Sequence, residues 1–124
     1  MKKTKALFWT TTIFLLLFEG VMPISTLLFA PEYALVGINA LEYPDYFGYT
    51  LIAFKAIGAI LLIMPNLPRP LKEWTYAGFA FNFVYASISH FVIDGFTYVS
   101  FFPLIFVAIL AVSYTNYFKL YQQN

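Results

Sequence analysis

The sequence contains no cysteine, a single histidine and few charged residues. Without cysteine, the chain cannot form disulfides, thiolate metal sites or cysteine-ligated iron–sulfur clusters. One histidine and scattered carboxylates do not supply the converging ligands of a metal site, so we expect no bound metal and no haem held by two histidines. The formal net charge of +1 gives no basic patch for nucleic acid. The chain therefore lacks an electron carrier of its own.

What the sequence has in quantity is apolar surface. Hydrophobic residues make up 61% of the 124 residues and charged residues only 10%, against about 25% charged residues in soluble domains. Four apolar spans, at 6–28, 46–64, 72–93 and 98–118, are each near the roughly 20 residues that cross a bilayer as a helix. We predict an all-α fold, an integral membrane antiparallel four-helix bundle in the lipid bilayer. Residues 1–124 would form one domain.

The basic residues predict the orientation of this bundle. Those outside the hydrocarbon lie before the first span, in the second loop and after the fourth span. The charged residues of the first and third loops are all acidic. The positive-inside rule then places both termini in the cytoplasm. An alternative is that Lys2–Phe18 is a signal peptide, but apolarity resumes beyond Glu19 and no small-x-small cleavage site follows.

Two opposite charges lie inside the first two spans, Glu19 and Lys55. Ionised groups at membrane depth are costly and usually face a partner or a cavity. At about 1.5 Å per residue, Glu19 lies roughly 20 Å from the cytoplasmic end of its span, a depth compatible with Lys55 in the next, antiparallel helix. We expect the two to pair. The pair either lines a ligand or proton site or serves only to hold two helices together.

The third span carries a small and polar stripe. Gly78, Asn82, Tyr85 and Ser89 recur at helical spacing and should face the bundle rather than lipid. Asn82 is a candidate for a hydrogen bond to a ligand at mid-depth, and the alternative is an amide bond between helices. His90 is a candidate proton donor because Asp94 follows one turn later, and the alternative is a helix-end histidine in headgroup water.

Further expectations concern the ends of the spans. Glu73 suits the positive end of the third helix dipole and can pair with Arg69, while Lys72 should snorkel and Trp74 should anchor at the interface. Pro23 should kink the first helix or end it early. Aromatic residues near the span ends are assigned to interfacial belts, namely Trp9, Tyr46, Tyr49, Trp74, Tyr98, Tyr114 and Tyr117.

Two long stretches resemble the DoxX-like family. The run YPDYF at 43–47 followed by FKAIGAI at 54–60 is similar to one family motif, and PNLPRPLKEWTYAGF at 65–79 is similar to a second. Ser89-His90 matches the pair that ends the third helix in the family. The resemblance covers residues 43–95 and implies a four-helix protein of the bacterial cytoplasmic membrane. The family-motif positions carried over are Lys55, Lys72, Glu73, Trp74, Gly78, Ser89 and His90.

The resemblance also implies a role. The wider DoxX group includes a membrane subunit linked to quinone-dependent sulfur oxidation, which implies an accessory subunit that binds a quinone or other lipophilic ligand beside a redox partner. Lys55 or His90 would bond the ligand carbonyls. Aromatic walls would come from Phe54, Phe81, Phe83 and Tyr85. We expect no catalytic residues and no catalytic activity of the chain alone.

Two other functions remain open from the sequence. The chain can be a non-catalytic scaffold or assembly factor, in which the Glu19–Lys55 pair only holds two helices together. It can also be a small transporter with Glu19 and Lys55 lining a path. Four helices are few for a path through one chain, so a transporter would have to be a homo-oligomer.

Overall fold

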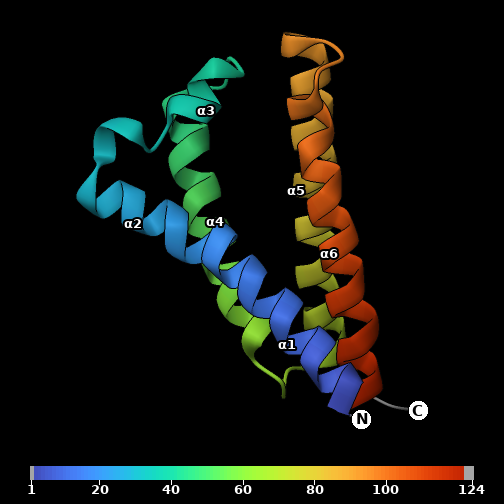
Figure 1. The fold of residues 1–124 in the computed structure, drawn as a ribbon. Coiled ribbons are helices and arrows are strands. Elements are labelled where there is room, and N and C mark those ends of the chain that lie inside the picture. Colours follow the sequence, from blue (N-terminus) through green and yellow to red (C-terminus); the bar gives the residue numbers. More distant parts are fainter. Residues whose placement is uncertain (1, 122–124) are drawn as a thin grey trace.

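The structure is a computed structural model that describes residues 2–121, and within that range every regular element is a helix (Figure 1). The first long segment joins α1 (Lys2–Leu16), a π-helix η1 (Leu17–Val21) and α2 (Met22–Phe29). A short 3₁₀ turn η2 (Pro31–Tyr33) and α3 (Val36–Ala40) form the first loop. Three further long helices follow, α4 (Asp45–Ile63), α5 (Arg69–Asp94) and α6 (Tyr98–Tyr121).

Four helical segments in residues 2–121 are long and apolar enough to cross a membrane: Lys2–Phe29, Asp45–Ile63, Arg69–Asp94 and Tyr98–Tyr121. The all-α prediction and the four apolar spans are therefore confirmed. Successive long helices run in opposite directions, and the beginning of α1 and the end of α6 lie at the same end of the molecule (Figure 1).

The first long helix changes its hydrogen bonding in the middle. In η1 the N–H of Met22 bonds the carbonyl of Leu17, five residues back instead of four. Pro23 follows directly; it has no N–H, and its ring would clash with the carbonyl four residues earlier in a regular helix. A wider π turn ahead of the proline relieves that clash. Pro23 thus does not end the helix early, because helical structure continues to Phe29.

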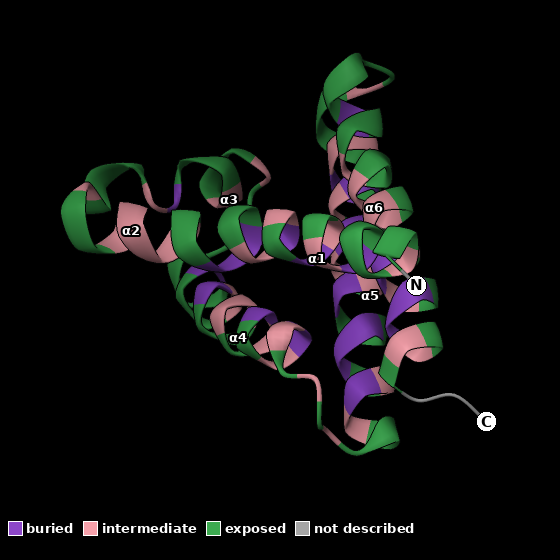
Figure 2. Ribbon diagram, turned by 60° about the horizontal axis from the view of Figure 1, so that its bottom comes forward, coloured by how far each residue is buried: buried purple, intermediate pink, exposed green. Residues whose placement is uncertain are grey.

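The helices form two pairs that meet at one end: the first long helix lies with α4, and α5 lies with α6. α5 packs along α6, and α1 packs against α6, while α4 packs against η1, α1 and α5. Burial follows this arrangement: the buried residues concentrate where α1, α5 and α6 meet, and α2 and α3 are mostly exposed or half-buried (Figure 2). The core cluster consists of Phe8, Leu15, Ala59, Leu62, Tyr76, Phe79, Phe83, Leu110 and Tyr117.

Polar groups inside this core join α1, α5 and α6. The hydroxyl of Ser113 on α6 lies 2.6 Å from that of Thr12 on α1 and 2.7 Å from that of Tyr76 on α5. All three residues are buried. The polar candidates named from the sequence all lie in the first three spans, whereas here α6 supplies the central hydroxyl. Small hydroxyl groups are typical of contacts between membrane helices, where they hydrogen-bond across the interface.

Lys72 joins the second, third and fourth long helices. Its side chain is 0% exposed, and its ammonium donates to the carbonyls of Leu61 and Leu62 at 2.7 Å and of Met64 at 2.8 Å. These carbonyls lie at or just beyond the end of α4, where a helix leaves carbonyls without an α-helical partner; that of Leu61 also accepts the N–H of Met64 at 3.4 Å. The ammonium also lies 4.4 Å from the ring centre of Tyr117, a cation–π contact.

This arrangement corrects two expectations. Lys72 does not snorkel toward the headgroups, because the turn between α4 and α5 directs it inward onto the end of α4. Tyr117 does not belong to an interfacial belt, because it is fully buried and its hydroxyl donates to the carbonyl of Pro65 at 2.8 Å. Among the other assigned belt residues, Tyr46, Tyr49, Trp74 and Tyr98 are exposed.

Candidate functional site

The two charges inside the first two spans meet. Lys55, midway along α4, places its ammonium 3.0 Å from a carboxylate oxygen of Glu19 in η1. The predicted contact is therefore present. Glu19 is 8% exposed, and Lys55 is half-buried. Because a lone charge at this depth would be costly, the two residues place opposite charges side by side.

Local sequence explains why these elements approach so closely. Gly20 follows Glu19, and a Cβ atom placed on it would lie only 2.9 Å from the Cβ of Ala59 on α4. Small residues at such crossings let helix backbones come together in a membrane. The π turn at Leu17–Val21 then sets the direction of the Glu19 side chain toward Lys55. Single-turn π segments inside α-helices occur frequently at functional sites.

Lys55 also lines a cavity of about 400 Å³ between α4 and α5. The walls are mostly apolar, and the polar groups in them are few. The lining residues are Leu51, Phe54, Lys55, Ile57, Gly58, Leu61, Leu71, Trp74, Thr75, Gly78, Phe79 and Asn82. An apolar cavity of this size with a few convergent polar groups is the usual form of a small-molecule site. We call it the α4–α5 cavity.

Asn82 faces Lys55 across this cavity, from α5. Its amide makes no hydrogen bond to any other residue in the part of the chain that the structure describes. An amide carries donors on nitrogen and an acceptor on oxygen, so it can bind either kind of group. Gly78, one turn before Asn82, adds open space: a Cβ there would meet nothing within 4 Å. The interhelical amide bond that was the alternative for Asn82 is absent from residues 2–121.

The aromatic walls differ from those expected. Phe54 lines the cavity as predicted, and it is joined by Trp74 and Phe79. Phe83 lies in the core cluster instead, and Phe81 points away from the core, 75% exposed.

The α4–α5 cavity continues toward the first loop as a smaller one of about 70 Å³. It is lined by Asn82, Tyr85 and Ser89 from α5. Ser89 is buried, but Tyr85 is 62% exposed and Gly78 is exposed as well, so the predicted stripe faces the bundle only in part. Tyr43 closes this end: its hydroxyl lies 2.7 Å from that of Ser89. No sequence feature predicts this bond; Tyr43 lies in the first family motif, and Ser89 lies in the separate Ser89-His90 match.

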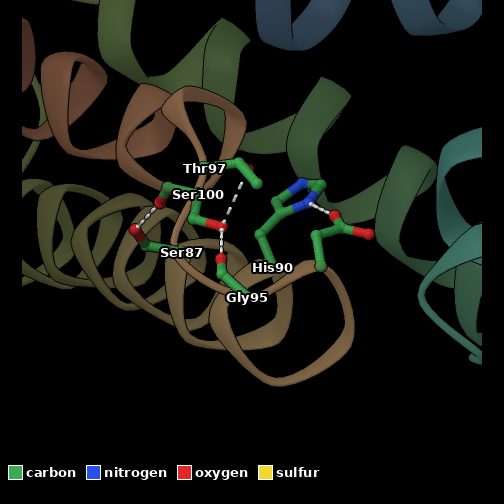
Figure 3. A network of polar contacts seen from close by, with 6 residues as sticks. Ser87, His90, Gly95, Thr97 and Ser100 are labelled. Atoms are coloured by element: carbon green, nitrogen blue, oxygen red, sulfur yellow. Dashed lines mark hydrogen bonds and ion pairs between the residues drawn. The ribbon is translucent and has the colours of Figure 1, made fainter.

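His90 does not join this group. Its Nδ1 lies 2.8 Å from a carboxylate oxygen of Asp94, as the one-turn spacing predicts, but the described residues that line the α4–α5 cavity do not include it. Figure 3 shows the imidazole turned away from a neighbouring cluster in which the Ser100 hydroxyl donates to the Gly95 carbonyl at 2.6 Å. Ser87 donates to the Ser100 carbonyl in the same cluster. His90 therefore belongs to the turn between α5 and α6.

The remaining motif residues occupy the start of α5. Glu73 accepts a hydrogen bond from the hydroxyl of Tyr114 at 2.6 Å and lies 3.5 Å from Nε of Arg69. The predicted Arg69–Glu73 pair is present, and Glu73 mainly joins α5 to α6. Trp74, on the adjacent face, lines the α4–α5 cavity and is 75% exposed. No group of three or more metal-ligating side chains converges within residues 2–121.

Of three comparisons with known proteins, one found a match and two found none. The model of a family described as the DoxX-like family matches residues 8–113, which extends the resemblance of residues 43–95 into the first and last long helices. Neither the curated proteins nor the solved structures include a match to this chain.

Proposed function

The chain belongs to the DoxX-like family and is a multi-pass membrane protein, and from that premise we propose that it binds a lipophilic carbonyl ligand in the α4–α5 cavity. A quinone is the ligand class that fits best. The chain would act as an accessory subunit beside a redox partner. The observation that carries this proposal is that Lys55 and Asn82, from two facing helices, line one apolar cavity of about 400 Å³.

The polar groups of the cavity match a neutral ligand with carbonyl oxygens. The Lys55 ammonium has three donors, and in residues 2–121 its recorded partner is Glu19 alone. It can therefore donate to a ligand oxygen while Glu19 balances its charge. Asn82 can donate to a second oxygen of the same ligand. Because the pair is neutral overall, a neutral ligand enters without adding net charge at membrane depth.

The walls suit a flat ring with an apolar tail. Phe54, Trp74 and Phe79 offer aromatic surfaces on which a ring can pack. Phe54 and Trp74 are largely exposed in the single chain, so the cavity faces the hydrocarbon, and a lipophilic ligand reaches it from the bilayer. Electron transfer needs a redox group, which the partner subunit would have to supply.

Orientation and membrane form part of the proposal. The beginning of α1, the loop between α4 and α5, and the end of α6 share one end of the molecule (Figure 1). The basic residues gather at that end, and the positive-inside rule places it in the cytoplasm. The family motifs support the bacterial cytoplasmic membrane as the location.

A scaffold or assembly role is the second candidate. It is favoured by the close contact of Gly20 with Ala59 beside the Glu19–Lys55 pair, since together these would serve simply to hold the first long helix against α4. It leaves unexplained why Asn82 lines the cavity without a protein partner. We therefore rank it below ligand binding.

Tryptophan fluorescence gives a direct test. The chain has two tryptophans, so Trp9→Phe leaves Trp74 as a reporter in the cavity wall. A short-chain ubiquinone analogue titrated into the purified variant in nanodiscs should quench Trp74 saturably. Lys55→Met should raise the Kd about tenfold, the loss expected for one hydrogen bond to a charged donor.

The matched control is the same substitution made at two asparagines. Asn82→Leu should weaken binding, whereas Asn116→Leu should not, because Asn116 on α6 bonds the Val112 carbonyl within its own helix. Quenching that never saturates, or that is the same in Lys55→Met and Asn82→Leu as without these substitutions, would show that the quinone only partitions into lipid near Trp74.

A further inference from the structure

We propose that Lys55 is also reached by water from the side of the first loop, through a second cavity that serves as an aqueous inlet. This cavity of about 230 Å³ lies between α2, η2, α3 and α4, and Lys55 lines it as well as the α4–α5 cavity. We call it the outer cavity. Lys55 is thus part of the wall of two spaces on different sides of α4.

The outer cavity leads from Lys55 toward the loop end of α4. Ile52 and Gly48 mark successive turns of α4 along it, and Tyr33 and Ile38 from the first loop line its far end. Tyr33 is exposed, and the loop around it carries Glu32 and other acidic residues but no basic ones. Such a loop lies in water, so the far end of the cavity is its aqueous end.

The break in the first long helix is an independent reason for water in this cavity. Pro23 lines it and supplies no N–H to the Glu19 carbonyl. The N–H of Met22 goes to Leu17, so the Phe18 carbonyl also loses the donor that a regular α-helix would give it. At membrane depth, carbonyls freed in this way need a donor from a neighbouring side chain or from water. Met22 and Pro23 lie in the wall of the outer cavity, so water in that cavity would lie next to the break.

The inlet gives the ion pair a source of protons. The titratable groups that face Lys55 or line the inlet are Glu19 from η1 and Tyr33 from η2. If a ligand oxygen made negative by electrons from the redox partner takes a proton from the Lys55 ammonium, the neutral amine left behind takes one from water, and the hydroxide formed leaves through the inlet. Intramembrane ionisable residues that face water-filled cavities commonly form such relays. This last step depends on the proposed function, whereas the inlet itself does not.

Single cysteines test the inlet cleanly, because the chain has none of its own. Ile52 lines the outer cavity, and Ala53, the next residue at almost the same depth, is exposed on another face of α4. A membrane-impermeant cationic methanethiosulfonate added from the loop side should label Ile52→Cys at least about tenfold faster than Ala53→Cys, since the reactive thiolate forms in water and not in hydrocarbon. N-ethylmaleimide, which crosses lipid, checks that both thiols are intact.

Equal labelling of the two thiols, or labelling of Ile52→Cys only from the side of the chain termini, would overturn the inlet. If Ile52→Cys does not accumulate, Thr26→Cys on α2 lines the same cavity and takes its place with the same expectation. Failure of the proposed function would look different: the cysteines would label as expected while the short-chain ubiquinone failed to quench Trp74 saturably.

Discussion

Two lysines of the long helices, Lys55 and Lys72, are half-buried or buried, and the structure uses them in opposite ways. Lys72 is completely buried, and its ammonium donates three hydrogen bonds to carbonyls at the end of α4. Lys55 is half-buried, has Glu19 as its recorded partner in residues 2–121, and lines two cavities. One ammonium is fully occupied by the fold, and the other keeps donors for something else.

The difference shows how a structural charge can be told from a candidate functional one. A buried cation is stable when every donor has a partner, and Lys72 meets that condition without any carboxylate. Lys55 instead meets a counter-ion, which neutralises its charge but leaves its hydrogen-bonding capacity unfilled. Spare donors beside an apolar cavity are what a ligand site requires.

Removing the Lys72 ammonium should give the largest loss of stability. Lys72→Met leaves the carbonyls of Leu61, Leu62 and Met64 without their donor, which should lower the free energy of unfolding by on the order of 4 kcal/mol. Unfolding in mixed micelles, followed by circular dichroism, measures this. Lys5→Met at an exposed position of α1 is the control and should change little. A Lys72→Met protein as stable as wild type would show that Lys72 does not stabilise the fold.

Breaking the Glu19–Lys55 pair should cost less and in a distinctive way. Lys55→Met or Glu19→Leu alone leaves one charge at membrane depth and should lower the free energy of unfolding by about 2 kcal/mol. The double variant should recover most of that loss, because no lone charge remains. The same micelle unfolding measures all three. If the double variant lost as much as the two singles added together, the residues would not be acting as a pair.

The polar contact in the core should have a smaller effect. Ser113→Ala removes the hydroxyl shared by Thr12 and Tyr76 and should cost about 1–2 kcal/mol, since two buried hydroxyl groups lose a partner. Ligand binding in the α4–α5 cavity should stay unchanged, which Trp74 quenching can check. A loss of quinone binding in Ser113→Ala would mean that the cavity depends on core packing and not on Lys55.

The sequence predicted the parts of this molecule that depend on hydropathy and local spacing. The four apolar spans, the meeting of Glu19 with Lys55, and the His90–Asp94 contact all follow from residue type, helix rise and the cost of charge in lipid. The role of Lys72 did not follow, because its partners come from a chain reversal at residues 64–68 and from Tyr117, far away in sequence. The outer cavity could not be predicted either, since it depends on how the first loop covers α4.

His90 gives the smallest expected effect. Its Asp94 contact belongs to the turn between α5 and α6, so His90→Gln should change the free energy of unfolding by less than about 0.5 kcal/mol, as for a surface pair. The Kd for a quinone should be unchanged, in contrast to Lys55→Met. A raised Kd in His90→Gln would indicate that His90 contacts the ligand and that the binding site lies nearer the loop end of α5.

The measurement that tests the account most directly is native mass spectrometry of the purified protein. Wild type should carry a lipophilic molecule released from detergent micelles. The double variant of Glu19→Leu with Lys55→Met should fold and lose that molecule, while Asn116→Leu keeps it. A double variant that retains the same molecule in the same amount would show that Lys55 is as structural as Lys72, and the proposed site would fall.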